Sequence, residues 1–427
     1  MADPIPKKPA KISTEPPRGM RDILPDEAEL RDTTAETILG VYRRYGFRRI
    51  ETPALENIQL LTRGEGGENE KLIFKVLKRG EKLDLAQATS EADLVDLGLR
   101  FDLTVPLARY YANNQARLPR PLKAVQIGPV WRAERPQKGR FRQFTQCDID
   151  ILGIRSEVAE IELILATTEA LTALGLEDLT VRINDRRLLT ALAAWCGFDP
   201  DRYDSAFITL DKWDKLDPTA IVEELGRAGH APVAIQRMVQ MFTKFDKGEG
   251  LEGVRQYVKD PDGAQAIDGL KRIIEAVRSA SGRPIVWDET LVRGMSYYTG
   301  PIFEITSARF PSSIAGGGRY DRLIGNLLGH DVPATGFSIG FERVVAILMD
   351  RTGGIERRAK RVALVFDEAT ADLKPVLEEA RALRAQGYDV SLELRAKRSG
   401  AQAASLREQG FDVRWFGAAV PPAGDQA

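Results

Sequence analysis

The stretch Trp131–Asp150, WRAERPQKGRFRQFTQCDID, predicts both a local fold and a ligand. Its first half places five cations around a glycine turn, at Arg132, Arg135, Lys138, Arg140 and Arg142. Its second half alternates as strands do, which puts Phe144, Gln146, Asp148 and Asp150 on one face. Such a face is a poor core face. Cations can hold a polyphosphate, an aromatic ring can cover a base, and carboxylates can hold an amine or imidazole. The alternative is a solvated basic hairpin, because charge runs are usually surface.

Length and net charge limit the expected number of domains and the kinds of partner. A chain of 427 residues is expected to hold more than one domain around a large core. Lys and Arg number 61 against 62 Asp and Glu, so the net charge is −1. This balance neither demands nor excludes a nucleic-acid partner, and any RNA binding must use local patches.

Cysteine and histidine are scarce. Cys147 and Cys196 alone predict a reducing, cytoplasmic location without a disulfide framework or a cysteine-based zinc site. The two histidines, His230 and His330, are expected at the surface, and so few histidines argue against a histidine-ligated metal. No apolar run reaches transmembrane length. Residues 1–17 lack an apolar signal segment and are expected to form a mobile leader.

Periodicity and turn residues predict the order of elements. Residues 25–45 are expected to form an amphipathic helix with Gly46 at its C-terminus, followed by a strand over 47–52 that Pro53 ends. Strands are expected over 123–131 and 179–183, with a helix over 157–174 between them. The segments from about 190 to 280 are helical in pattern and predict an inserted helical subdomain. Strands return at 284–287 and 298–306, and residues 336–349 predict a strand followed by a helix.

The last part of the chain predicts a separate unit. Strands at 362–366, 389–394 and 412–416 alternate with helices at 371–386 and 400–409. This βαβαβ order predicts a small parallel sheet. The expected division is therefore a main domain over 18–355 and a small α/β domain over 361–427.

Several motifs resemble those of a known enzyme class. Arg132-x-Glu134 with the Gly139–Phe144 loop resembles motif 2 of class II aminoacyl-tRNA synthetases, and ERPQKGRFRQF resembles their histidyl-tRNA synthetase family. The helix and strand before Pro53 resemble class II motif 1, and Gly336–Arg343 resembles motif 3. LVRGMSYY at 291–298 resembles the family's LVRGLDYY signature, and GGGRYD at 316–321 its second histidine-specific motif.

The resemblance implies an α+β fold. The expected catalytic domain is a class II antiparallel β-sheet flanked by helices, with the helical insertion and an anticodon-binding-like C-terminal domain. It implies a homodimer that activates L-histidine with ATP and Mg²⁺, the ion being held through the nucleotide's phosphates rather than by side chains alone. The product is then transferred to tRNA(His). No role for a membrane or for DNA is expected.

The resemblance also assigns residues. Arg293 and Arg132 are the expected catalytic residues, because charge stabilisation dominates phosphoryl chemistry. The residues expected to bind ATP are Arg132, Glu134, Arg140, Phe144 and Arg343. Those expected to bind histidine are Asp102, Thr104, Arg132, Gln146, Asp150, Arg293, Tyr297, Tyr298 and Tyr320.

Three features depart from the family pattern and keep other functions open. Asp102 and Asp150 stand where the family often has Glu, Ser296 stands where LVRGLDYY has Asp, and the C-terminal unit is short. One alternative is a synthetase-like regulatory subunit that binds histidine without activating it. Another is a relative that forms the adenylate and transfers histidine to an acceptor other than tRNA.

Overall fold

The computed structural model describes residues 13–62, 69–135, 141–213, 216–245, 250–292, 298–350, 360–368 and 372–416. The chain divides into two compact units, Met1–Asp350 and Arg351–Ala427. Within the described ranges, no helix combines the length and apolar character that crossing a bilayer requires.

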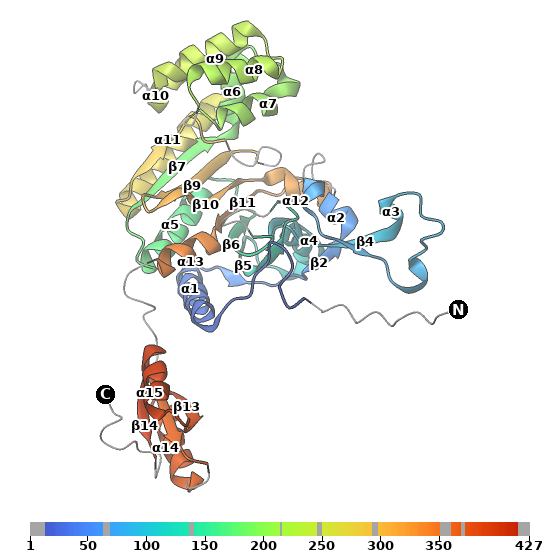
Figure 1. The fold of residues 1–427 in the computed structure, drawn as a ribbon. Coiled ribbons are helices and arrows are strands. Elements are labelled where there is room, and N and C mark those ends of the chain that lie inside the picture. The colour runs from blue at the N-terminus through green and yellow to red at the C-terminus, as the bar shows by residue number, and fades with distance from the viewer. Residues whose placement is uncertain are drawn as a thin grey trace. The chain divides into compact units, whose positions relative to one another are not determined.

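An eight-stranded sheet forms the centre of the first unit, in the order β1-β5-β6-β11-β10-β9-β7-β8 (Figure 1). Neighbours from β5 to β7 in this order pair antiparallel, whereas the edge strands β1 and β8 pair in parallel with β5 and β7. The bounds are β1 (Arg48–Arg49), β5 (Leu122–Trp131), β6 (Gln143–Leu152), β7 (Leu179–Asp185), β8 (Ile285–Trp287), β9 (Pro301–Ser307), β10 (Phe310–Arg319) and β11 (Ala334–Ile339). This antiparallel-rich sheet confirms the expected fold class.

The edge strand β1 is shorter than the sequence predicts. The predicted strand over 47–52 pairs over Arg48 and Arg49, with one further hydrogen bond from Ile50 N to Val125 O at 3.0 Å. After Ile50 the backbone is bound by a side chain instead of a strand, because Arg100 Nη1 donates to the carbonyl oxygen of Thr52 at 2.7 Å. The buried Arg100 side chain therefore supplies the hydrogen bond that a neighbouring strand would supply to the Thr52 carbonyl group if β1 were longer.

Helices cover both faces of the sheet (Figure 1). One face packs against α1 (Pro25–Arg44), α5 (Val158–Ala173) and α13 (Phe341–Met349). The helix α1 begins and ends as predicted, with Asp26 and Glu27 in its first turn and Gly46 at φ +82° after its end. The other face carries α4 (Thr104–Asn114) and α12 (Asp321–Leu328), which pack on each other.

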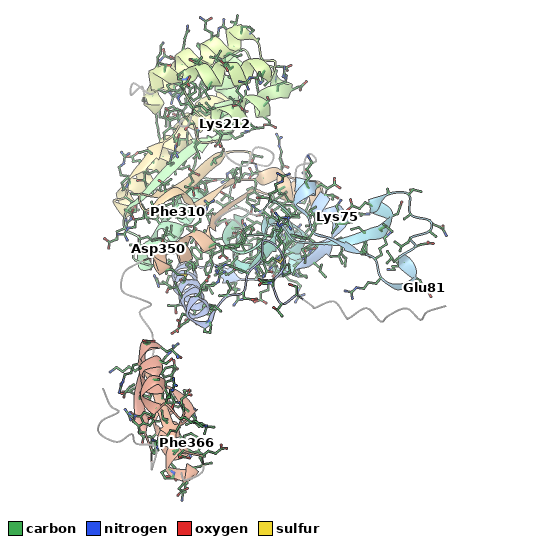
Figure 2. The ribbon with its side chains drawn as sticks, viewed as in Figure 1. Lys75, Glu81, Lys212, Phe310, Asp350 and Phe366 are labelled. Carbon is green, nitrogen blue, oxygen red and sulfur yellow. The ribbon has the colours of Figure 1, made fainter. Side chains whose placement is uncertain are left out.

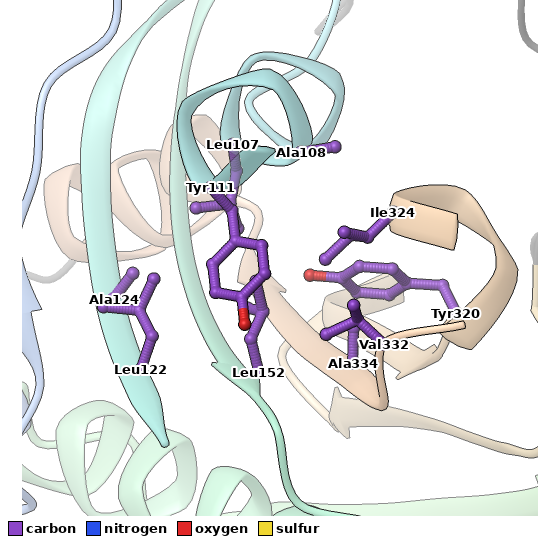
Figure 3. Packing of buried hydrophobic residues seen from close by; sticks show 10 residues of the cluster. All are labelled: Leu107, Ala108, Tyr111, Leu122, Ala124, Leu152, Tyr320, Ile324, Val332 and Ala334. Carbon is purple, nitrogen blue, oxygen red and sulfur yellow. The ribbon is translucent and has the colours of Figure 1, made fainter. Parts of the chain in front are cut away.

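A cluster of buried apolar residues joins α4 and α12 to the sheet (Figure 3). Leu122, Ala124 and Leu152 come from β5 and β6, and Figure 3 shows the ring of Tyr320 lying between Ile324 and Val332. This packing places Tyr320, directly after β10, in one cluster with Leu152 of β6.

The described residues between 186 and 281 form helices and turns and no strand, as predicted. It contains α6 (Arg186–Cys196), α7 (Tyr203–Leu210), α8 (Pro218–Arg227), α9 (Pro232–Phe245), α10 (Leu251–Val254) and α11 (Pro261–Ser281), with 3-10 turns at Pro200–Arg202 and Arg255–Tyr257. Asp185, Asp217 and Asp260 cap three of these helices by accepting backbone N–H groups.

One prediction for this insertion is wrong. His230 is not a surface residue but is 7% exposed, because its ring packs edge-on at 5.1 Å from the ring of Phe198 and its Nε2 lies 3.2 Å from Ser205 Oγ. His330 is exposed, as expected. Cys147 and Cys196 are buried and free.

A three-stranded sheet in the order β2-β4-β3 extends away from the central sheet. It consists of β2 (Leu55–Asn57), β3 (Lys75–Leu77) and β4 (Val95–Leu99). Between these strands in sequence lie α2 (Ile58–Thr62), α3 (Glu91–Leu94) and 3-10 turns at Asn69–Leu72 and Gly80–Lys82, while a third 3-10 turn, Gln115–Arg117, follows α4. Figure 2 places Glu81 at its outer end and Lys75 closer to the central sheet. The strand β4 leads through residues 100–103 into α4.

The second unit has the predicted parallel βαβαβ order. It consists of β12 (Arg361–Phe366), α14 (Leu373–Ala385), β13 (Asp389–Leu394), α15 (Ser399–Glu408) and β14 (Phe411–Trp415), with strand order β13-β12-β14. The central strand is buried on both sides: Val362 and Leu364 pack against α14, and Ala363 and Val365 face Leu406 of α15.

Candidate active site

An inner pocket of about 200 Å³ lies on the α4 and α12 face of the central sheet. Strands β6, β10 and β11 form its floor, and the turn before α4 forms one wall. Its lining consists of Leu72, Phe101, Asp102, Thr104, Arg132, Gln146, Asp148, Asp150, Tyr298, Gly316, Gly317, Tyr320, Gly336, Phe337 and Ser338. Segments distant in sequence therefore converge on one small polar cavity.

The strand β6 supplies the acceptors of the inner pocket. Gln146, Asp148 and Asp150 line it from alternate positions, as the sequence predicts, while Cys147 and Ile149 are buried on the opposite face. Gln146 Oε1, Asp148 Oδ1 and Asp150 Oδ2 are buried and have no hydrogen-bond partner among the described residues. Buried acceptors without partners are costly and rare in native proteins. The pocket is thus built for a ligand rich in N–H donors.

The carboxyl groups of the inner pocket have raised pKa values. Burial, with the nearby charge of Asp102, raises the pKa of Asp148 to about 7, although a hydrogen bond from Ser338 opposes the shift. Burial and the charge of Asp148 raise the pKa of Asp150 well above its usual value. Burial also raises the pKa of Asp102, even though Val105 N donates to its Oδ1 at 3.1 Å. Three such groups in one cavity favour a cationic ligand.

Tyr320 orients Asp150. Its hydroxyl donates to Asp150 Oδ1 at 2.5 Å, while its ring is 2% exposed and belongs to the cluster of Figure 3. Tyr320 is therefore both a core residue and a pocket residue. Gly336 leaves room for this pair, because a Cβ there would lie 2.1 Å from Asp150 Oδ1. Gly317 is similarly closed to any side chain by the carbonyl oxygen of Gly336.

An outer pocket of about 420 Å³ continues from the inner one. It is lined by Arg132, Glu134, Phe141, Phe144, Thr145, Gln146, Ser313, Ala315, Gly316, Ser338, Ile339, Gly340, Phe341, Glu342 and Arg343. Arg132, Gln146, Gly316 and Ser338 line both pockets. A guanidinium group therefore stands where a molecule in one pocket would meet a molecule in the other.

The cations and aromatic rings of the outer pocket are held in defined positions. Arg132 Nε donates to Phe101 O at 3.0 Å, and its guanidinium lies 5.1 Å from the centre of the Phe144 ring. Arg343, in the first turn of α13, donates to the carbonyl oxygen of Ser313. Phe144 and Arg343 thus offer an aromatic ring and a guanidinium to one cavity, a pair suited to a flat nucleobase.

An ion-pair network fixes the outer pocket to α1. Arg31 makes two hydrogen bonds to Glu342, of 2.6 and 2.7 Å, and its Nη2 also donates to Thr145 Oγ1 at 2.9 Å. Thr145 N donates to Glu342 Oε1 at 2.9 Å. Burial alone would raise the pKa of Glu342, but Arg31 and Thr145 hold this pKa below its usual value. Glu342 is therefore a charged link between β6, α13 and α1.

The positions expected from the sequence fall into two groups. Those within the described residues lie in the pockets: Asp102, Thr104, Arg132, Gln146, Asp150, Tyr298 and Tyr320 in the inner one, and Arg132, Glu134, Phe144 and Arg343 in the outer one. Arg140, Arg293 and Tyr297 lie outside the described residues, as does Ser296.

Sequence reasoning did not assign roles to Asp148, Ser338 and Glu342. Asp148 carried a signal, since it alternates with Gln146 and Asp150 on one strand face. Ser338 lies opposite Asp148 in the pairing of β11 with β6, and Glu342 pairs with a residue 311 positions away, so no local pattern points to either.

Within the described ranges, no group of three or more His, Cys, Asp or Glu is placed to hold a metal ion. The arrangement instead joins an acceptor-rich pocket to an aromatic and cationic one at a shared arginine. On an antiparallel sheet flanked by helices, these features define a class II aminoacyl-tRNA synthetase catalytic domain.

Comparisons with known proteins narrow this class. Residues 19–344 match the family model described as histidyl-tRNA synthetase. A histidine–tRNA ligase of Leifsonia xyli subsp. xyli is 46% identical over 393 residues, covering 90% of each chain. One from Gloeobacter violaceus is 38% identical and covers 88% of this chain and 84% of its own.

A solved histidyl-tRNA synthetase from Nostoc sp. PCC 7120 superposes with a TM-score of 0.75 at 27% identity, covering 94% of this chain and 90% of that one. The chain therefore belongs to the histidyl-tRNA synthetase family.

Proposed function

We propose that this chain is a histidine–tRNA ligase. The carboxylate of L-histidine attacks the α-phosphorus of ATP, pyrophosphate leaves, and histidyl-adenylate forms. A hydroxyl of the terminal adenosine of tRNA(His) then attacks the carbonyl carbon and releases AMP. The observation that carries this proposal is the meeting of the two pockets at Arg132, since amino acid and nucleotide must join there.

The inner pocket suits histidine. An ammonium group and an imidazole N–H supply the donors that Gln146 and Asp150 lack within the described residues. We assign Asp102, Thr104 and Gln146 to the α-amino end and Asp150, Tyr298 and Tyr320 to the ring, with Tyr297 completing this set. A site built to pair every polar group of its substrate rejects amino acids that leave one unpaired.

The outer pocket suits ATP. Phe144 and Arg343 are assigned to the two faces of adenine, Glu134 to its amino group and Arg140 to the outer phosphates. Arg132 and Arg293 are assigned to the α-phosphate, where they stabilise charge that develops as the carboxylate attacks. Holding the two substrates next to each other also lowers the barrier to adenylate formation.

Mg²⁺ is proposed to arrive with the nucleotide. The ion prefers phosphate and carboxylate oxygens. The described carboxylates of the outer pocket are Glu134 and Glu342, and Arg31 already binds Glu342. The phosphates are therefore the main ligands, and the ion neutralises their charge.

We further propose a cytoplasmic homodimer whose C-terminal unit contacts tRNA. The dimer is proposed because the segment from α1 to β1 resembles class II motif 1, a resemblance that implies a homodimer. Contacts to tRNA phosphates are assigned to the cations Arg395, Lys397, Arg398 and Arg407 of the C-terminal unit, of which the last three are exposed. A mass of twice 47.3 kDa by light scattering is the expected result for the dimer, and a monomer mass refutes it.

Aminoacylation tests the whole proposal. Purified protein, ATP, Mg²⁺, labelled histidine and tRNA(His) are expected to give charged tRNA, with Arg293→Ala inactive. Histidine binding without adenylate or charging indicates the regulatory-subunit function, and adenylate formation without charging indicates another acceptor.

A further inference from the structure

Asp148 holds a position that the assignments above leave unused. It lies between Gln146 and Asp150 on the pocket face of β6 and is 4% exposed. Its cross-strand neighbours are Gln126 of β5 and Ser338 of β11. Gln126 directs its amide nitrogen to Leu103 O at 3.0 Å, and Ser338 hydrogen-bonds the Asp148 carboxyl group. Even so, Asp148 Oδ1 has no partner among the described residues.

Within the described part of the chain, the cations whose charge acts on Asp148 are Arg100 and Arg132, and both make other contacts. Arg100 donates to the carbonyl oxygens of Thr52 and Pro129, at 2.7 and 3.0 Å. Arg132 donates to Phe101 O and stacks on Phe144. Of the residues that the structure describes, the other titratable groups around Asp148 are Asp102, Asp150, Tyr298 and Tyr320 in the pocket, with Tyr42 and Cys147 behind the strand.

The geometry of a strand indicates which ligand atom Asp148 receives. Residues two apart on one strand face are separated by roughly 6.6 Å along the strand. An N–H···O contact to an ion is about 2.8 Å, so two such contacts span up to about 5.6 Å, and one nitrogen reaches acceptors of both Gln146 and Asp148 where their side chains lean together by about 1 Å. A primary ammonium has three donors. The ring end of the pocket is taken by Asp150 and Tyr320, which already form a pair.

We propose that Asp148 is a further specificity-determining residue, whose carboxylate pairs with the α-ammonium group of histidine and releases a proton to solvent as the ligand binds. The inference rests on the proposed function, since it takes histidine as the ligand. Before histidine binds, the negative charges of Asp102, Asp148 and Asp150 would repel one another if all three were ionised, so these carboxyl groups together retain a proton. An incoming ammonium makes the ionised form of Asp148 favourable, and the proton leaves.

The raised pKa of Asp148 agrees with proton release on histidine binding. Burial and the charge of Asp102 place the pKa of Asp148 at about 7, so part of the population is protonated at neutral pH. A neighbouring cation lowers such a pKa. Histidine binding is therefore expected to strengthen as pH rises from 6 to 8 more than the ionisation of histidine alone explains.

Asp148→Asn separates the charge from the shape. Its affinity for histidine is expected to fall about tenfold or more, as loss of a charged hydrogen bond implies. Its affinity for 4-imidazolelactate, in which a hydroxyl replaces the ammonium group, is expected to stay within about twofold of the wild-type value. Asp201→Asn, at an exposed position of the insertion, is the matched control and should change neither affinity. An equal loss for both ligands, or no loss for histidine, overturns the proposal.

Calorimetry in the wild-type protein gives an independent test. Titrating histidine at pH 7 in phosphate and in Tris, which differ in ionisation enthalpy, is expected to show net proton release, and Asp148→Asn is expected to show less. Equal release in the two proteins, or none in the wild type, overturns the proposal even when the variant is unstable. Wild-type protein that binds no histidine contradicts the proposed function instead.

Discussion

Replacing Tyr320 with phenylalanine isolates one hydrogen bond of the inner pocket. The ring stays in the cluster it shares with Ile324 and Val332, whereas the hydroxyl that donates to Asp150 Oδ1 at 2.5 Å is lost. Because the ring is 2% exposed in the wild type, apolar packing is unchanged. The expected effect is therefore on the orientation and ionisation of Asp150 rather than on the fold.

The magnitude follows from the charge of the acceptor. A hydrogen bond to a charged group contributes about 1.5–3 kcal/mol, which corresponds to roughly a 10- to 150-fold change in an equilibrium constant. Burial raises the pKa of Asp150 and the Tyr320 hydroxyl opposes the shift, so the variant keeps its Asp150 proton to higher pH. The KM for histidine should therefore rise most at pH 6.5 and recover partly at pH 8.5, while the KM for ATP stays unchanged.

Pyrophosphate exchange at several pH values measures both constants. Tyr111→Phe is the matched control, because Tyr111 lies in the same buried cluster but does not line either pocket. An unchanged histidine KM in Tyr320→Phe, or an equal rise for histidine and ATP, refutes the view that this hydroxyl orients the ring-binding carboxylate.

Three further substitutions test other parts of the account. Glu342→Gln should lower the free energy of unfolding by about 2–3 kcal/mol in urea titrations, because the side chains of its pair with Arg31 are only 17% and 14% exposed, whereas Glu223→Gln in a well-exposed pair should cost under about 0.5 kcal/mol. Asp148 has a folded-state pKa of about 7, above its unfolded value of 3.8, so its contribution to wild-type stability falls by up to about 1.4 kcal/mol per pH unit between pH 4 and 7. The melting temperature of Asp148→Asn should therefore exceed that of the wild type at pH 8 but not at pH 4. Equal melting temperatures at pH 8 would contradict the claim that ionised Asp148 destabilises the folded protein. Gly336→Ala should reduce histidine activation about 100-fold by displacing the Asp150 carboxylate, and near-normal activation would show that the strand adapts.

Local patterns predicted much of the fold. The alternation in 144–150, the caps around α1 and the strand–helix order of the C-terminal unit all depend on neighbours in sequence, so they could be read from the chain. The strand over 47–52 is shorter than predicted and the surface position of His230 is wrong, for a common reason. Arg100 and Phe198 determine them, and such contacts arise only after folding.

The candidate site shows the same limit. Gln146 and Asp150 could be placed on one face because their spacing is local, and Asp148 shared that spacing although it received no role. The bond between Arg31 and Glu342 spans 311 positions, so periodicity carries no information about it. The pairing of Tyr320 with Asp150 likewise needs strands β6 and β10 to be placed in one sheet.

Histidine-dependent exchange between ATP and labelled pyrophosphate tests the central claim most directly. The two pockets and their shared arginine predict exchange with histidine, and none above background with the other amino acids. No exchange by protein that still binds histidine and ATP would contradict the claim that the two substrates react where the pockets meet.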